Sequence, residues 1–346
     1  MQQIKISLII CTYMRPQPLS RLLESVLLQT QVPDEVLIID GSTNELTKNA
    51  ITQFQLKRNK EVTAGFSTLD SLRYFQVPAA HRGLTKQRNY GIDRVSEEME
   101  VVAFLDDDTI LEPSYFQELL ATYHTYPDAV GVGGYITNEV SWEPSPIEDK
   151  NDLNYFYYDG YRRKESSRYM LRRKLGLAQK TPPAVYPAFG HGRSISFLPP
   201  SGKIYQVEQL MGGVSSFPLA ILKQHQFSEY FEGYGLYEDA DFTLRLSKIG
   251  NLYVNTAASL EHHHDAAGRP NQYSYGKMVV RNGWYVWRVK HPHPSFKNKW
   301  KWYQITLLLA AIRFLNIFTT SERKEAFTES MGRTMGILSL LFSKPR

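Results

Sequence analysis

The feature that most constrains the fold is residues 101–111, with the sequence VVAFLDDDTIL. Five apolar residues lead directly into three acids, Asp106, Asp107 and Asp108. A short, continuous apolar run of this kind predicts a strand that is buried on both faces, as in a parallel sheet. Ligands of open α/β sheets bind beyond the carboxyl ends of the strands, so we expect the three carboxylates to lie where a ligand binds.

Three consecutive acids repel one another unless a cation lies among them. A hard divalent ion is the natural candidate, because it prefers oxygen ligands and often holds the phosphates of a nucleotide. The alternative is a solvated acidic turn with no ligand.

The first 136 residues alternate strands with helices. The patterns predict strands at residues 5–11, 36–40, 72–77 and 129–136, and helices at 19–29, 46–56, 82–95 and from Pro113 onward. A β-α-β order of this kind predicts a parallel sheet. Neither GxGxxG nor GxxxxGKS follows the first strand, which removes the main support for a dinucleotide-binding or P-loop protein.

The composition is that of a globular protein with anionic partners. Of the 346 residues, 42% are hydrophobic and 22% are charged, which excludes a disordered chain and a multi-pass membrane protein. The net charge of +5 favours nucleotide phosphates, a membrane surface or nucleic acid. The single cysteine, Cys11, indicates a reducing compartment, and the N-terminus enters a strand with no secretory leader, so we expect a cytoplasmic protein.

Residues 137–201 break the alternating pattern with Pro-rich and aromatic-rich sequence. We interpret them as an insertion near the acceptor side of the site. Tyrosines in residues 155–161 adjoin seven Lys and Arg residues in 162–174, a mixture that could hold a phosphate or stack on a sugar. Equally, the aromatic residues could form a local core, with the basic residues on a solvated helix face.

Two further clusters carry chemistry. In residues 234–250, Phe242, Leu246 and Ile249 give a helix one apolar face, which places Glu238 and Asp239 at its N-terminus. An ionised acid there either caps the helix or acts as a base. In residues 261–265, EHHHD, three histidines near a predicted strand end are plausible metal ligands.

Together these motifs resemble glycosyltransferase family 2, the inverting, sugar-nucleotide-dependent enzymes of GT-A fold. The resemblance covers residues 4–265 and lies in the order ISLIICTYMR, LIIDGST, RGLTKQRNYGI, AFLDDDTILEP, GGVSSFP and FEGYGLYEDADFTLRL, followed by a histidine. It implies an α/β fold of the GT-A, Rossmann-like type, with a mostly parallel central sheet.

The resemblance also implies the roles of the acidic residues and the histidines. Asp106 and Asp108 match the DxD motif, in which Asp108 holds a divalent ion (Mn or Mg) and Asp106 reaches the ribose or the metal shell. Glu238 and Asp239 match an ED pair whose Asp is the general base. His262 fits the metal-binding histidine best, with His263 and His264 as alternatives.

The remaining implied residues contact the nucleotide-sugar donor. The positions around the base are matched by Thr12, Tyr13, Arg15 and Asp40. A loop and helix start that contact the base and diphosphate are matched by Gly83, Leu84 and Arg88. The set is completed by Asp107, Gly212, Gly213 and Arg269. Arg269 would close over the diphosphate, or it is an ordinary surface arginine. Cys11 replaces a Pro of many members, and Asp40-Gly41 replaces an Asp-Asp or Asp-Asn pair, which leaves the identity of the base open.

The chain changes character after the catalytic domain that we expect at residues 1–268. Residues 303–318 and 335–342 are strongly apolar, and residues 288–346 contain eleven Lys or Arg but only three Glu. An apolar stretch of sixteen residues is short for crossing a bilayer but suits a helix in the interface of an anionic membrane. We therefore expect residues 269–346 to be helical and membrane-associated. The alternative is a helical subdomain packed on the catalytic domain.

The sequence thus predicts an inverting, metal-dependent glycosyltransferase on the inner face of the cell membrane. Its donor would be a nucleotide-diphosphate sugar and its acceptor a saccharide or a lipid-linked hydroxyl, in polysaccharide or glycolipid biosynthesis, with no nucleic-acid partner. The alternatives are a nucleotidyltransferase of the same fold and a non-catalytic carbohydrate-binding module.

Overall fold

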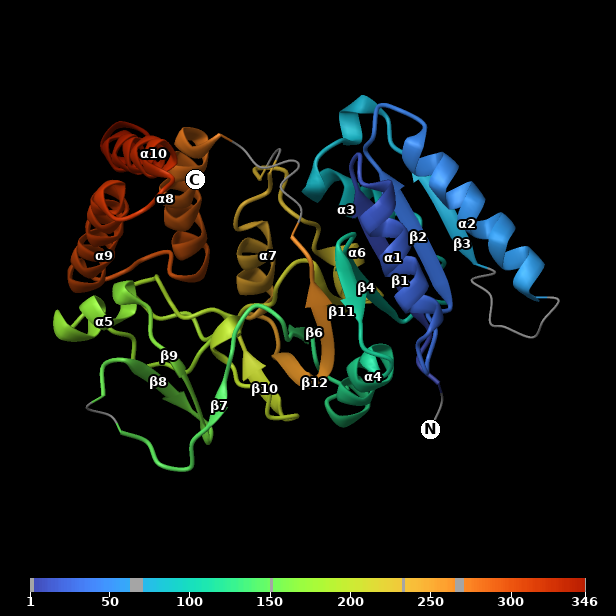
Figure 1. Ribbon diagram of the computed structural model, residues 1–346, viewed down its shortest axis with the longest axis horizontal. Coiled ribbons are helices and arrows are strands. Elements are labelled where there is room, and N and C mark those ends of the chain that lie inside the picture. The colour runs from blue at the N-terminus through green and yellow to red at the C-terminus, as the bar shows by residue number, and fades with distance from the viewer. Residues whose placement is uncertain (1–2, 63–70, 150–151, 232–233, 265–270, 346) are drawn as a thin grey trace. The chain divides into compact units, whose positions relative to one another are not determined.

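The computed structural model describes residues 3–62, 71–149, 152–231, 234–264 and 271–345, which group into two compact units (Figure 1). Unit 1 comprises Met1–Glu139 and Pro200–Asp265, and unit 2 comprises Val140–Pro199 and Ala266–Arg346. The domain boundary predicted at residue 268 stays a prediction.

Unit 1 is built on a nine-stranded sheet with the order β10-β12-β6-β11-β4-β1-β2-β3, in which β5 pairs with β12. Its strands are β1 (Ile6–Thr12), β2 (Glu35–Asp40), β3 (Leu72–Gln76), β4 (Val101–Asp106), β5 (Thr109–Leu111), β6 (Gly131–Ile136), β10 (Ile204–Val207), β11 (Val214–Pro218) and β12 (Leu252–His262). Strands β1, β2, β3, β4, β6 and β12 run in one direction, and β5, β10 and β11 run in the other. The mostly parallel sheet predicted from the sequence is confirmed.

Helices cover both faces of this sheet. They are α1 (Pro16–Leu27), α2 (Leu46–Val62), η1 (Ala79–His81), α3 (Leu84–Ile92), α4 (Tyr115–Thr125), α6 (Leu219–Gln224) and α7 (Glu238–Leu246). On one face, α1 and α4 share a core with alternate strand residues such as Leu8 and Ala103. On the other face, α3 lies against β1 and β2, and Phe242 of α7 stacks on Phe227. Burial on both faces explains the continuous apolar sequence of β1 and β4.

Strand β11 reverses direction between two strands of the parallel set. It pairs antiparallel with β4 on one side and with β6 on the other. Its first residue therefore lies beside the last residues of β4, with Val214 opposite Leu105. This reversal brings the Gly212-Gly213 turn that precedes β11 to the edge of the sheet where β4 ends.

Helix α7 is shorter than the apolar pattern indicates. It ends at Leu246, and Ile249, predicted to share the apolar face with Phe242, is 54% exposed. The chain leaves the helix in a turn, in which the backbone N–H of Ile249 donates to Leu246 and that of Gly250 does the same. That part of the prediction is wrong, because the turn rotates Ile249 away from the core.

Unit 2 combines a small antiparallel sheet with helices. It contains β7 (Glu143–Pro144), β8 (Tyr155–Tyr158), β9 (Tyr161–Lys164), α5 (Ser167–Lys174), η2 (Ile195–Phe197), α8 (Gln272–Lys290), α9 (Phe296–Leu315), η3 (Asn316–Phe318) and α10 (Arg323–Phe342). The three strands have the order β7-β9-β8. Trp284 and Trp287 of α8, Trp302 of α9 and Leu340 of α10 form the core of the helical part. The helical C-terminal region predicted from the sequence is confirmed.

Glycines allow α8 and α10 to approach closely. A Cβ atom added at Gly276 would collide with the backbone carbonyl of Glu329, and one added at Gly332 would collide with that of Tyr273. Small residues at such a crossing let two helix backbones come into contact. In the part of the chain that the structure describes, no helix is both long enough and apolar enough to cross a membrane.

Candidate functional site

The carboxyl ends of three parallel strands meet at one edge of the unit 1 sheet. The register places Thr12 of β1 opposite Asp40 of β2, and Cys11 opposite Asp106 of β4. Gln87 of α3 ties the first two ends together, because its side-chain amide donates to the backbone oxygens of Thr12 and Ile39. Residues predicted to bind the nucleotide-sugar donor, from three separate segments, therefore lie at this edge.

The three consecutive acids take different directions from the end of β4. The side chain of Asp106 is 40% exposed, whereas the side chains of Asp107 and Asp108 are each only 5% exposed. Burial of two carboxylates excludes the solvated acidic turn. Burial raises the pKa of Asp107 to about 6, although hydrogen bonds from Thr12 and Arg15 act in the opposite direction.

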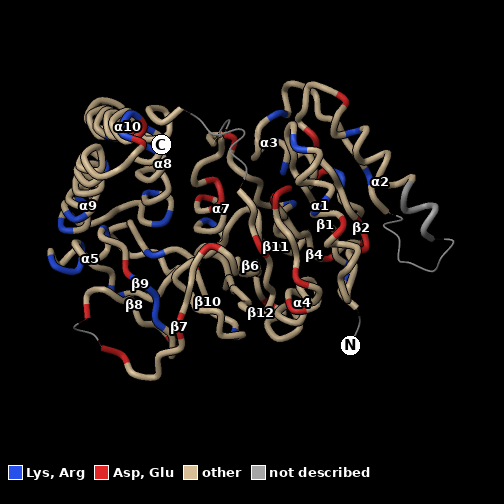
Figure 2. Tube along the Cα trace, in the orientation of Figure 1, with Lys and Arg blue, Asp and Glu red and all other residues tan. Residues whose placement is uncertain are grey.

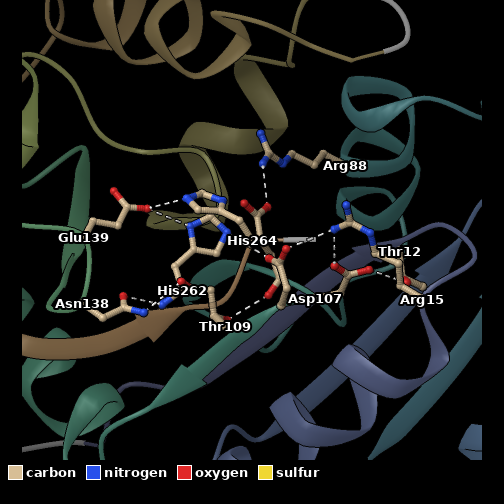
Figure 3. A network of polar contacts seen from close by, with 11 residues as sticks. Thr12, Arg15, Arg88, Asp107, Thr109, Asn138, Glu139, His262 and His264 are labelled. Atoms are coloured by element: carbon tan, nitrogen blue, oxygen red, sulfur yellow. Dashed lines mark hydrogen bonds and ion pairs between the residues drawn. The ribbon is translucent and has the colours of Figure 1, made fainter. Parts of the chain in front are cut away.

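Thr12 and Arg15 contact the acids (Figure 3). The Thr12 hydroxyl donates to Asp107 over 2.6 Å, and the Arg15 guanidinium lies 3.1 Å from Asp107 and 3.2 Å from Asp108. Both residues were predicted at the base-binding end. Arg15 neutralises part of the negative charge that the acids bring together.

His262 joins the acids from the end of β12. Strand β5 pairs antiparallel with β12, which places His262 opposite Thr109, and the backbone N–H of His263 donates to the Asp108 carbonyl. The His262 Nε2 atom then lies 3.0 Å from Asp108 Oδ1. Burial acts to lower the pKa of His262, but hydrogen bonds to Asp108 and Glu139 outweigh it and raise this pKa to about 10.

Asp106, Asp108 and His262 offer ligand atoms that all lie within 4.8 Å of one another. Two carboxylate oxygens and one imidazole nitrogen are a donor set that suits Mn²⁺ or Mg²⁺. The other two histidines are not part of this group: His263 pairs with Glu261 and His264 with Glu139, each over 2.9 Å, and His264 forms a second group of possible ligands with Glu139 and His262. The residues present therefore fit a divalent cation, with His262 as the histidine of the group.

A buried ion pair lies behind Asp106. Arg88 Nη1 is 2.5 Å from Glu238 Oε1, and Arg88 Nη2 is 3.9 Å from Asp106 Oδ1. Arg88 and Glu238 are 2% and 6% exposed. Burial raises the pKa of Glu238, while the adjacent Arg88 guanidinium acts to lower it and favours the ionised carboxylate. The Glu238 carboxylate therefore forms an ion pair with Arg88 inside the protein.

Gly212 and Gly213 make room for these charged groups. A Cβ atom at Gly212 would collide with Glu238 and Arg88, and one at Gly213 would collide with the Asp106 carboxylate. The backbone N–H of Asp106 donates to the Gly213 carbonyl over 3.1 Å. The two glycines thus let the turn before β11 pass directly against the acids.

Asp239 follows Glu238 in the first turn of α7. Its Oδ1 accepts a hydrogen bond from the backbone N–H of Ala240 over 2.7 Å. Burial raises its pKa, while that N–H and the charge of Arg88 act to lower it. The N-cap residue is Tyr237, in left-handed conformation with φ of 71° and without a side-chain cap. Neither acid occupies the cap position, which removes the main support for a capping role.

The other predicted donor residues are spread along the same edge. Asp40 is fully buried and accepts hydrogen bonds from the Tyr74 hydroxyl at 2.7 Å and the Ser42 N–H at 2.8 Å. Tyr13 is 52% exposed. Gly83 has φ of 115° and precedes Leu84, the first residue of α3. Arg269 lies outside the described residues.

The sequence prediction missed Asn138 and Glu139. The Asn138 side chain donates to the His262 carbonyl and accepts from its N–H, each over 3.0 Å, and Glu139 lies 3.3 Å from His262 Nδ1. Their position directly after the predicted strand of residues 129–136 was the available signal, because that strand ends at the ligand-binding edge.

The basic and aromatic residues of the insertion contact one another within unit 2. Arg193 makes a bidentate ion pair with Glu165. Its Cζ atom lies over the rings of Phe156 and Phe197, 4.1 and 4.7 Å from their centroids. Tyr169 packs on Phe197 in an edge-on arrangement. These aromatic residues form the local core that was one of the two interpretations of the segment.

The sequence model of the family described as Glycosyl transferase family 2 matches residues 7–188. A glucosyl-dolichyl phosphate glucuronosyltransferase of Haloferax volcanii is 32% identical over 136 residues, which cover 38% of this chain and 38% of that protein. An uncharacterized glycosyltransferase of Nostoc sp. is 32% identical over 129 residues, or 37% of this chain and 35% of that protein. The matched segment thus spans less than two-fifths of the length of these relatives.

Among solved structures, residues 1–349 of S. aureus TarS in complex with UDP are similar over 92% of this chain and 73% of that chain. The sequence identity is 17% and the TM-score is 0.49.

The buried ion pair leads to a testable expectation for stability. Changing Arg88 to Met leaves Glu238 buried without its partner, and we expect a loss of about 3–5 kcal/mol in the free energy of unfolding, measured by urea denaturation. Arg82→Met, at an exposed position six residues earlier, should change stability by less than about 0.5 kcal/mol. Adding Glu238→Gln to Arg88→Met should recover part of the loss. An Arg88→Met variant as stable as the parent would contradict the assignment.

Proposed function

The chain belongs to glycosyl transferase family 2, and we propose that it transfers a sugar from a nucleotide-diphosphate donor to an acceptor hydroxyl, with inversion of configuration. The observation that carries the proposal is the placement of Asp106, Asp108 and His262 around one point, at the edge where the buried Glu238 and the adjacent Asp239 lie. A cation-binding group beside a carboxylate base is the combination that this reaction requires.

The donor would bind at the carboxyl ends of β1, β2 and β4. Asp106, Asp108 and His262 would hold Mn²⁺ or Mg²⁺. When bound, such an ion acts as a Lewis acid that neutralises the leaving diphosphate. Thr12, Arg15 and Asp40 would lie toward the nucleoside end, as the family resemblance implies.

Asp239 would act on the acceptor. Its carboxylate accepts the proton of the attacking hydroxyl while that oxygen bonds to the anomeric carbon. The bond from this carbon to the diphosphate oxygen breaks on the opposite face, and the nucleoside diphosphate leaves with the bonding electrons. Glu238, paired with Arg88, would keep the start of α7 in place for this step.

The acceptor class that we favour is a lipid-linked saccharide. The name of the Haloferax relative describes transfer to a glucosyl-dolichyl phosphate. A lipid-linked acceptor also agrees with the surface of unit 2 that is described below. A role in polysaccharide or glycolipid biosynthesis follows from this acceptor class.

We propose further that α9, η3 and α10 contact the inner, anionic face of the cell membrane. Many large apolar side chains of these elements are exposed: Phe296, Trp300, Leu307, Phe314, Leu315, Phe318, Phe327, Met331, Met335, Leu338, Leu341 and Phe342. On α10, Phe327, Met331, Met335, Leu338 and Phe342 recur at helical spacing and form one exposed stripe. Exposed apolar surface of this extent marks an interaction site.

Charge complementarity supports an anionic membrane as the partner of this surface. Lys297, Lys299, Arg323 and Lys324 are exposed on α9 and α10. Figure 2 marks the Lys and Arg positions along the trace of these helices. Arg313 and Arg333 pair with the buried Glu329 and are used inside the unit. Apolar side chains flanked by free cationic groups suit the interface of a bilayer that contains anionic lipids.

Asp108→Ala should abolish metal-dependent donor binding, and His262→Ala should weaken it, because these variants remove ligand atoms. Calorimetric titration with Mn²⁺ and a panel of nucleotide sugars measures the effect. His263→Ala serves as the control, since that side chain pairs with Glu261, and we expect it to bind as the parent does. Undiminished affinity in Asp108→Ala would remove the metal role.

Asp239→Asn keeps the size of the side chain but removes its basicity. We expect turnover to fall by about 10²-fold to 10⁴-fold, with donor affinity nearly unchanged, because Asp239 acts on the acceptor. Asp128→Asn, at an exposed position in a turn, is the control and should retain full turnover.

The products of the same reaction provide two independent checks. Proton NMR of the product anomer should show inversion relative to the donor, and retention would exclude a single displacement assisted by Asp239. Release of pyrophosphate in place of a nucleoside diphosphate would identify a nucleotidyltransferase. Absence of turnover with a broad donor panel would favour a non-catalytic binding module.

The membrane proposal predicts that the protein sediments with vesicles that contain anionic phospholipid at low salt, and that high salt partly releases it. Replacing Phe314, Phe318 and Phe342 by Ser, or Lys297 and Lys299 by Gln, should weaken this binding. Lys48→Gln and Lys223→Gln, which remove two exposed charges from unit 1, should not. Failure to bind anionic vesicles, or burial of the stripe in a homodimer detected by light scattering, would contradict the proposal.

A further inference from the structure

We infer that Glu139 is a positioning residue that orients the His262 imidazole toward the cation. The inference rests on the proposed function, because it takes His262 as a ligand of the divalent ion. Nothing in the sequence motifs singles out Glu139, which follows β6 and is the last residue of the first segment of unit 1.

The two ring nitrogens of His262 face two different carboxylates (Figure 3). Nε2 lies 3.0 Å from Asp108 Oδ1, on the side of the cation-binding group, and Nδ1 lies 3.3 Å from Glu139 Oε1. The His262 side chain is only 14% exposed, so the ring has little freedom to turn. Each nitrogen therefore has its own acidic partner.

The residue before Glu139 fixes the backbone at the same point. Asn138 donates to the His262 carbonyl and accepts from the His262 N–H, each over 3.0 Å. Two consecutive residues thus hold His262, one through its main chain and the other through its ring. This arrangement extends β12 to its last residue and directs the side chain toward Asp108.

The chemistry of a ligating imidazole requires such a partner. A histidine binds a metal through the lone pair of one nitrogen, so the other nitrogen must carry the proton. A carboxylate beside Nδ1 stabilises the tautomer protonated there, fixes the plane of the ring and raises the basicity of Nε2. Glu139 stands on the side of the ring that faces away from Asp108, where this partner is needed.

His264 provides the internal comparison. Its Nε2 also lies 2.9 Å from Glu139 Oε1, and Glu139, His262 and His264 offer ligand atoms within 4.8 Å of one another. If these three side chains bound a cation directly, His264 and Glu139 would be equally necessary. If Glu139 positions His262, His264 is dispensable. His264 is 52% exposed, in contrast to His262.

The test measures Mn²⁺ affinity of the full chain by the electron paramagnetic resonance of free Mn²⁺, without donor or turnover. Glu139→Ala should weaken binding by about 10-fold to 100-fold, as is usual for the partner of a metal-binding histidine. Glu139→Gln keeps an oxygen acceptor without the charge, and its affinity should lie between that of Glu139→Ala and the parent. His264→Ala should bind within about twofold of the parent.

A double-mutant cycle separates positioning from a general structural effect. In the His262→Ala background, Glu139→Ala should cause little further loss, because the ring on which it acts is gone. A full additional loss would overturn the inference, as would equal losses in Glu139→Ala and His264→Ala. Glu139→Gln keeps the test decisive if Glu139→Ala does not fold.

Failure of the inference can be distinguished from failure of the proposed metal site. If Asp108→Ala binds Mn²⁺ as tightly as the parent, the metal site itself is wrong. If Asp108→Ala loses binding while Glu139→Ala and Glu139→Gln retain parental affinity, the metal site is supported and only the positioning role of Glu139 is wrong.

Discussion

The candidate site depends on one buried cation. Burying a guanidinium group is unfavourable unless opposite charges and polarisable groups surround it. Arg88 has both, since Glu238 pairs with it, Asp106 lies close by, and the rings of Phe104 and Phe227 lie 5.7 and 5.1 Å from its central carbon. These partners come from the sheet, from α7 and from the loop before it. Arg88 therefore fixes the distance between the acidic end of β4 and the start of α7.

Much of the fold could be predicted from the sequence because its signals are local. Strands such as β1 and β4 are buried on both faces, so each is a continuous apolar run, and α1 shows the spacing of a helix with one buried side. The reversed direction of β11 could not be predicted. The sequence VSSFP is compatible with either direction, and its placement between β4 and β6 depends on strands that lie far away in the chain.

The site was predictable as a set of acidic and histidine residues but not as a network. The sequence brings Asp106, Asp107 and Asp108 together, whereas the register of separate strands decides that Asp107 meets Thr12 and Asp108 meets His262. The family resemblance favoured His262 among the three histidines, and in the structure His262 Nε2 lies 3.0 Å from Asp108 Oδ1. The hydrogen bonds of Asn138 to His262 join residues 124 positions apart, and the place of Asn138 after a predicted strand does not specify that partner.

The end of the first segment of unit 1 determines where this chain can be recombined with its relatives. Unit 2 receives its first segment after Glu139, and the chain returns to unit 1 at Pro200. Asn138 and Glu139 contact His262 of unit 1, so they belong to unit 1 although they fall within the insertion predicted at residues 137–201. A chimera that exchanges the insertion should therefore cut after residue 139. A cut after residue 137 would replace Asn138 and Glu139, the two residues that contact His262.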